Sequence, residues 1–117
     1  MSNAAAVNFL TLDVELKTGK ALIHCHGRLV GGTSNVLYAR VHELLPVCKR
    51  ITLDLTDLKF VDSMGLGTLV GLYISAKKVD SCLELINLGK QIRELLGITH
   101  LLGVFAGMCE QGITMKF

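Results

Sequence analysis

Regular alternation of apolar and polar residues constrains the fold of this chain more than any other feature. Every second residue is apolar in the segment FLTLDVEL (residues 9–16) and, from Ile51 to Leu55, in the segment RITLDLTDL (residues 50–58). A period of two is typical of a strand with one buried face. A parallel sheet covered on both faces would instead show continuous apolar runs. We therefore expect an α/β fold in which helices cover one face of a mixed sheet and solvent covers the other.

Three further strands complete the expected sheet. ALIHCHG (21–27) follows a turn at residues 17–20, so it is expected to pair back on residues 9–16 as an N-terminal β-hairpin at the sheet edge. CLELIN (82–87) is a fourth strand, and a last strand is expected around Val104 and Phe105. Gly27 to Gly32 is predicted to form a loop. Strand–helix–strand steps require right-handed crossovers, which make the rest of the sheet largely parallel.

Helical spacing of apolar residues predicts three helices, at residues 35–45, 64–78 and 89–96, all on one face of the sheet. Thr33 or Ser34 is expected to cap the first, and Asp62 or Ser63 the second. Gly97 is expected to end the third. The predicted buried stripes are Leu37, Val41, Leu44 and Leu45; Leu66, Val70 and Tyr73, with Leu69 and Ala76 beside them; and Ile92, Leu95 and Leu96.

Length and composition indicate one globular domain. The chain has 117 residues, of which 50% are hydrophobic and 19% charged, and such a chain can bury one independent core. We assign residues 9–117 to this domain and interpret residues 1–8 as disordered or as a cloning remnant (MSNA). The four cysteines form no C-x-x-C pair and are expected to be small apolar residues without disulfides.

Charge and hydropathy limit the partners and the location. The formal net charge of +2 is too small, and its lysines and arginines too scattered, to predict direct nucleic-acid binding. No apolar run approaches the roughly 20 residues of a membrane helix, so no membrane insertion is expected. The first residues lack the pattern of a secretion signal. We therefore predict a cytoplasmic protein.

The segment VDSMGLG places a hydroxyl, Ser63, at the start of a predicted helix directly after a strand. Gly65, Gly67 and Gly71 follow, and a glycine inside a helix costs about 1 kcal/mol relative to alanine. Either another element packs very close to these glycines, or a partner protein approaches the backbone there. Ser63 itself is either a simple helix cap or a residue on which function depends.

Three segments carry a resemblance to a known family, namely HGRLVGGTSNVLYARVHELL, ITLDLTDLKFVDSMGLGTLVGLY and LINLGKQIRELLGITHLLGVF. Over residues 9–105 the chain resembles the STAS domain family, typified by bacterial anti-sigma-factor antagonists. The resemblance implies a STAS-like mixed sheet. It also implies a partner that is both an anti-sigma factor and a serine kinase of the histidine-kinase-like ATPase fold. That kinase would phosphorylate Ser63 and release the antagonist, and a serine phosphatase would reset it.

The same resemblance places the partner surface around Ser63. The expected partner-binding residues are Asp62, Met64, Gly65, Leu66, Gly67 and Thr33. Met64 stands where members of the family often carry a second serine or threonine, so no alternative hydroxyl follows Ser63. Val30 replaces the acidic residue that usually follows G-R-L, and the usual final amphipathic helix is not evident after Phe105.

Other functional patterns are weaker. His24 and His26 could bind a metal together with Asp13 or Glu15, but structural zinc takes four ligands, so two solvent-facing histidines are favoured. Val61 replaces the first glycine of a G-x-S-x-G nucleophile motif. No cofactor, metal or enzymatic activity is therefore predicted. Two alternatives stay open, a non-phosphorylated STAS scaffold subunit of a lipid-transport or stress-signalling complex, and a small enzyme using Ser63 or Asp62.

Overall fold

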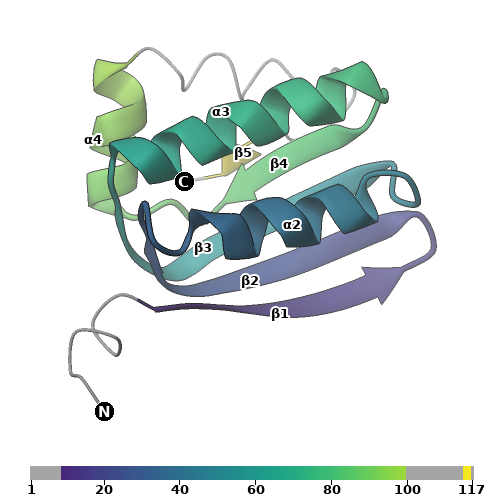
Figure 1. Cartoon of the computed structure of the whole chain (residues 1–117), viewed down its shortest axis with the longest axis horizontal. Helices are drawn as coiled ribbons and strands as arrows, with labels where there is room; N and C mark the ends of the chain where they lie inside the picture. The colour runs from purple at the N-terminus through teal and green to yellow at the C-terminus, as the bar shows by residue number, and fades with distance from the viewer. Residues whose placement is uncertain (1–8, 100–114, 117) are drawn as a thin grey trace.

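The computed structural model describes residues 9–99 and 115–116, in which a five-stranded sheet carries three helices (Figure 1). The strand order is β1-β2-β3-β4-β5. The strands are β1 (Leu10–Lys17), β2 (Lys20–Leu29), β3 (Arg50–Val61), β4 (Cys82–Ile86) and β5 (Met115–Lys116). Only the β1–β2 pair is antiparallel among them. The predicted mixed α/β sheet with an N-terminal hairpin at its edge is confirmed.

Some expectations lie outside the described residues. They concern the tail at residues 1–8 and the strand around Val104 and Phe105. Within the described part of the chain, no helix is long and apolar enough to cross a membrane. Cys25 and Cys48 are buried free thiols, as expected, whereas Cys82 is disulfide-bonded and departs from that expectation.

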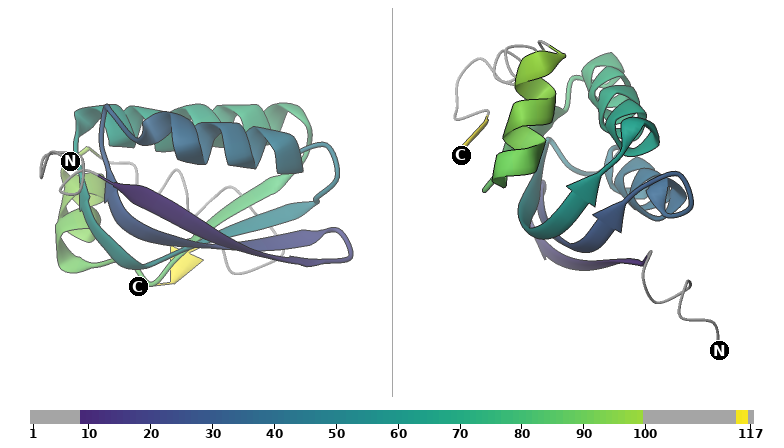
Figure 2. Two further views of the ribbon diagram at one scale, coloured as in Figure 1. Left: turned by 60° about the horizontal axis from the view of Figure 1, so that its bottom comes forward. Right: turned by 90° about the vertical axis from the view of Figure 1, so that its left-hand side faces the viewer.

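The core lies between the sheet and two of the helices. α2 (Ser34–Leu44) and α3 (Ser63–Lys78) lie side by side over one face of the sheet (Figures 1 and 2). Beneath them, the alternate residues Ile23, Ile51 and Leu53 are fully buried, which follows from the period of two in their strands. The predicted stripe of α2 is also buried, namely Leu37, Val41, Leu44 and Leu45.

The third helix takes a different position. α4 (Lys90–Ile98) stands steeply inclined to α3, at the end of the sheet where β3 leads into α3 (Figures 1 and 2). Ile92 and Leu96 fix it to the core, and the Gln91 side chain donates a hydrogen bond to the Val61 carbonyl at 3.3 Å. The helix continues through Gly97, so the prediction that this glycine ends it was wrong.

The predicted buried stripe of α3 was displaced by one position. Its buried residues are Gly65, Leu69, Leu72 and Ala76, while Leu66 and Tyr73 are partly buried at the margin of the core. The reason is local. The cap at Asp62 starts the helix so that the side-chain-free position 65 meets β2, and the buried face continues from there at helical spacing.

β2 is longer than predicted, because it continues through Gly27 to Leu29 instead of ending in a loop. Gly27 permits this with a positive φ of 113°, a backbone angle that residues with a side chain rarely adopt. A Cβ there would also lie 2.2 Å from the Phe9 carbonyl oxygen. The pairing of β2 with β3 shifts register between His24 and His26 and again between Gly27 and Arg28. Such irregularities bend a strand locally and increase its twist.

Candidate protein-interaction site around Ser63

Asp62 joins β3 to α3 and makes the junction rigid. Its Oδ1 accepts a hydrogen bond from the Gly65 amide at 2.8 Å, and its Oδ2 accepts one from the Gly31 amide at 3.2 Å. Its own amide donates to the Leu29 carbonyl at 3.2 Å. Of the two residues proposed as the helix cap, Asp62 is the one that caps. Through its backbone amide and its carboxylate, Asp62 therefore ties together three segments, namely the end of β2, the loop after it and the first turn of α3.

Because Asp62 takes the capping role, the hydroxyl of Ser63 is left for other contacts. Ser63 is the first residue of α3, and it is exposed. Among the described residues its hydroxyl has no hydrogen-bond partner. A helix start also carries unpaired amides and a partial positive charge. The site thus combines an accessible hydroxyl with a favourable environment for an anionic group.

The glycines of α3 have different surroundings. A Cβ at Gly65 would lie 2.1 Å from the Leu29 carbonyl oxygen, so another element does pack very close at that position. A Cβ at Gly67 would meet no atom of the described residues within 4 Å, and one at Gly71 would lie 3.8 Å from Tyr38. Gly65 is therefore required by the fold, whereas Gly67 and Gly71 leave the surface of α3 low and open.

Thr33 shapes the loop before α2 rather than capping the helix. It is buried, and its hydroxyl accepts a hydrogen bond from the Val30 amide at 3.0 Å and donates one to the Arg28 carbonyl at 2.7 Å. The hydroxyl of Ser34 donates to the Val30 carbonyl at 2.7 Å. α2 begins without a side-chain cap. Thr33 and Gly65, both predicted to bind a partner, are thus buried and stabilise the structure around Ser63 instead of being exposed in it.

The exposed part of the site is a stripe along α3. Met64, Gly67, Gly71 and Ile74 are spaced three or four residues apart, so they share one face of the helix; we call them the α3 stripe. Met64 is 63% exposed and Ile74 47%. Tyr38 of α2 borders the stripe at Gly71 and is 41% exposed. Sequence reasoning missed Ile74 and Tyr38, although the spacing from Met64 through the two glycines could have indicated Ile74.

The two histidines lie on the uncovered face of the sheet, as predicted, but each has partners. The His24 imidazole lies between Glu15 and Asp54, with nitrogen–oxygen distances of 2.8 and 2.9 Å. The His26 imidazole lies between Asp13 and Asp57 at 2.9 and 3.0 Å. In the described part of the chain, no group of three or more potential ligands is arranged to hold a metal ion.

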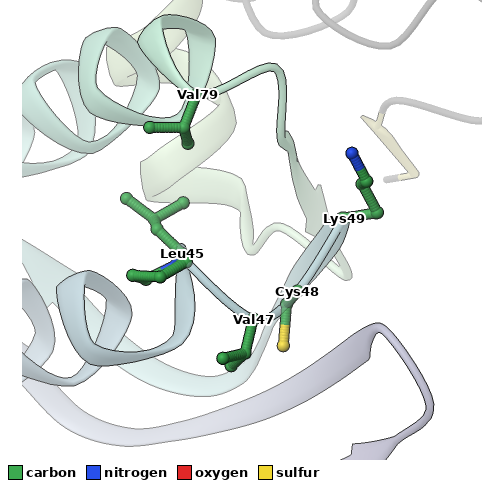
Figure 3. Close-up of a pocket in the computed structure, with 6 residues that line it drawn as sticks. Leu45, Val47, Cys48, Lys49 and Val79 are labelled. Atoms are coloured by element: carbon green, nitrogen blue, oxygen red, sulfur yellow. The ribbon is translucent and has the colours of Figure 1, made fainter.

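A pocket lies at the C-terminal ends of α2 and α3, away from Ser63. It has a volume of about 340 Å³ and lies between the end of α2, the loop to β3 and Val79 after α3 (Figure 3). Its lining is mostly apolar: Leu45, Pro46, Val47, Cys48, Lys49 and Val79. Because α3 has 16 residues, this pocket lies roughly 24 Å along the helix from Ser63. It is therefore separate from the candidate site.

Comparison with known families decides the classification. Residues 11–112 match the model of the STAS domain. The chain belongs to the STAS domain family. The fold and the family resemblance predicted from the sequence are thereby confirmed.

Solved structures of STAS domains show the same arrangement of strands and helices. The chain is similar to a putative anti-sigma factor antagonist from Thermotoga maritima, with a TM-score of 0.76, 16% identity and coverage of 91% of this chain and 86% of that one. It is also similar to the Bacillus cell fate determinant SpoIIAA in its phosphorylated form, with a TM-score of 0.69, 17% identity and coverage of 92% and 91%.

A third similar structure is a murine anion transporter, Solute Carrier 26 family member A9. The TM-score is 0.69 at 19% identity, and the match covers 94% of this STAS chain but 21% of the transporter. At these identities the likeness is one of fold. The same fold thus occurs both as a small antagonist and as part of a much larger transporter.

Proposed function

We propose that this STAS protein is a cytoplasmic anti-sigma-factor antagonist whose binding is controlled by phosphorylation of Ser63. In its unmodified form it binds an anti-sigma factor that is also a serine kinase of the histidine-kinase-like ATPase fold. A serine phosphatase returns the modified form to the binding state. The observation that carries the proposal is the exposed Ser63 hydroxyl, which is without a partner in the described structure because Asp62 caps the helix.

The first turn of α3 can hold a phosphate without losing its structure. A phosphoserine adds about −1.5 to −2 charges at neutral pH. The amides and the dipole of a helix start favour such a charge. The neighbouring Asp62 carboxylate is held by the Gly65 and Gly31 amides, so the modification removes none of its hydrogen bonds. The fold should therefore be nearly unchanged by phosphorylation.

The partner surface responds differently, because it is apolar next to Ser63. We infer that Met64 and Gly67 contact the partner, that Leu66 lies at the margin of the contact, and that the rest of the α3 stripe extends it. A phosphate at Ser63 would then have to lose its water in the complex, beside the like charge of Asp62. A buried and unpaired charge at an interface costs roughly 2–5 kcal/mol. Binding should consequently weaken by tens to thousands of fold.

The site offers no support for chemistry by this chain alone. Both carboxylate oxygens of Asp62 accept hydrogen bonds from backbone amides, so this carboxylate is not oriented to activate the Ser63 hydroxyl. A general base must lie within hydrogen-bond reach of the proton that it removes. We therefore propose a binding protein on which another enzyme acts.

The test measures modification and affinity separately. The parent and Ser63→Ala proteins are incubated with ATP and a candidate anti-sigma factor/serine kinase of the histidine-kinase-like ATPase fold, and intact mass should show one phosphoryl group on the parent alone. Calorimetry with that kinase should show parent-like binding for Ser63→Ala and a loss of tens to thousands of fold for Ser63→Asp. Thr18→Asp is the matched control, because it adds the same charge at an exposed hydroxyl in the β1–β2 turn.

One alternative function has specific support. The similarity to a transporter of the Solute Carrier 26 family favours a non-phosphorylated STAS scaffold subunit, of a lipid-transport or stress-signalling complex. A scaffold would bind its partner equally well as the parent and as the folded Ser63→Asp protein. Equal affinity together with no phosphoryl transfer would contradict the switch and favour this alternative.

A further inference from the structure

Two imidazoles connect three neighbouring strands across the uncovered face of the sheet. Nε2 of His24 lies 2.8 Å from Oε2 of Glu15 on β1, and its Nδ1 lies 2.9 Å from Oδ2 of Asp54 on β3. His26 repeats the arrangement two residues further along β2. Its Nε2 lies 2.9 Å from Asp13 of β1, and its Nδ1 lies 3.0 Å from Asp57 of β3.

This geometry specifies a protonation state for the histidines. An ionised carboxylate only accepts hydrogen bonds, and a neutral imidazole has one N–H donor. Both nitrogens of a ring can donate to two carboxylates only when that ring is an imidazolium. Each histidine can therefore make both of its contacts when it is protonated, and loses one of them when it is neutral.

The surroundings of His24 favour its charged form. The hydrogen bond to Glu15 raises the pKa of His24 above its usual 6.5, desolvation opposes that rise, and the contact with Asp54 adds to it. Burial of Asp54 disfavours its ionisation, but hydrogen bonds from Thr56, Asn87 and His24 lower the pKa of Asp54 to about 2. Asp54 is therefore an anion throughout the range in which His24 titrates.

The remaining charged side chains on this face are few among the described residues. Glu84 of β4 accepts hydrogen bonds from Thr52 and Arg50 of β3. The guanidinium of Arg28 lies over the Phe60 ring, 4.6 Å from its centroid. Lys20 of β2 and Lys17, opposite it on β1, lie on the same face at the exposed β1–β2 turn end. Among the described ion pairs, the four carboxylates around the two histidines pair with the imidazoles.

We propose that the contacts of His24 and His26 form a brace from edge strand β1 through β2 to β3, and that its His24 part is proton-dependent, holding when that imidazole is charged and partly released when it is neutral. The brace spans the stretch where β2 shifts register against β3. That stretch leads directly to Leu29, whose carbonyl contacts the first turn of α3. The proposal concerns the sheet and stands independently of phosphorylation at Ser63.

The sign of the pH effect follows from linkage. A histidine whose pKa is raised in the folded state contributes stability that is fully present below its unfolded pKa of about 6.5. That contribution is lost as the pH rises through the folded pKa of His24. Because these ion pairs are partly exposed, each is small, and the brace should change the unfolding equilibrium constant by about two- to fivefold.

Urea denaturation at about pH 6 and about pH 8.5, on either side of the usual histidine pKa, tests the brace. The parent should unfold at lower urea concentration at the higher pH, and His24→Gln should lose part of this difference. His42→Gln is the control, because His42 is exposed on α2 and stacks on Tyr38 rather than facing these carboxylates. It should keep the full difference.

A second measurement uses the unmodified protein and so does not depend on the variants folding. Imidazole ¹⁵N NMR at about pH 6 should show both ring nitrogens of His24 protonated. Raising the pH should convert this ring to a single tautomer while the stability falls. Equal pH dependence of stability in the parent and His24→Gln proteins would overturn the brace, as would a neutral His24 imidazole at the lower pH.

Discussion

The first turn of α3 and the uncovered face of the sheet both gather polar residues, but they satisfy them in different ways. Around Ser63 the backbone supplies the partners, since Asp62 accepts hydrogen bonds from the Gly65 and Gly31 amides. On the sheet face, His24 and His26 are paired with charged side chains. The first arrangement leaves a hydroxyl for a partner. In the second, the polar side chains pair with one another, so their contacts change when the His24 imidazole gains or loses a proton.

The same contrast appears between two glycines of α3. Gly65 faces inward, where the Leu29 carbonyl of β2 leaves no room for a side chain. Gly67 faces outward and is exposed. A glycine costs the helix the same conformational entropy at either position. The described residues explain only the first of them, and for the second we propose the partner contact.

Gly65→Ala should have the largest effect on stability. The new Cβ would lie 2.1 Å from a backbone oxygen, so β2 or α3 must shift. Overpacking costs about 1–3 kcal/mol, and a clash with backbone should fall at the upper end of that range. Urea denaturation measures this loss, with Gly71→Ala as the control because its Cβ would make an ordinary contact with Tyr38. A stable Gly65→Ala protein would contradict the close approach of β2.

Removing the cap should have a smaller effect. Asp62→Ala eliminates the acceptor for the Gly65 and Gly31 amides, and loss of an N-cap typically costs about 1 kcal/mol, within a range of roughly 0.5–2. Asp62→Asn should retain most of the stability, because asparagine caps about as well as aspartate. It should also weaken the like-charge repulsion of a phosphate at Ser63. If both variants unfold like the parent, Asp62 does not hold the junction.

The sequence predicted the sheet and the helix start at Ser63 because both depend on local patterns. Alternation in β1 and β3 indicated which residues are buried, and a polar residue before α3 indicated a cap. The separate roles of Gly65 and Gly67 could not be predicted in this way. They depend on where the Leu29 carbonyl of a distant strand meets the helix.

For a related reason, the side chains that contact the two histidines could not be predicted from the sequence. In the β1–β2 register Asp13 lies opposite His24, yet its carboxylate contacts His26, and Glu15 contacts His24. These diagonal contacts depend on side-chain rotamers and on the irregular pairing of β2 with β3. Alternation along one strand assigns a residue to a face of the sheet, but it does not select the neighbour that the residue contacts on that face.

Gly67→Ala should have the smallest effect on the fold and the clearest effect on function. Alanine is better than glycine in a helix by about 1 kcal/mol, and its Cβ would meet no atom of residues 9–99 within 4 Å, so the variant should be slightly more stable than the parent. If the low surface at Gly67 exists to admit a partner, the added methyl group should weaken calorimetric binding to the kinase while the melting temperature rises. Gly32→Ala is the control, because a Cβ there also meets no atom within 4 Å in the described part of the chain and lies outside the α3 stripe. A Gly67→Ala protein that binds as tightly as the parent would show that the partner does not approach the backbone at this position.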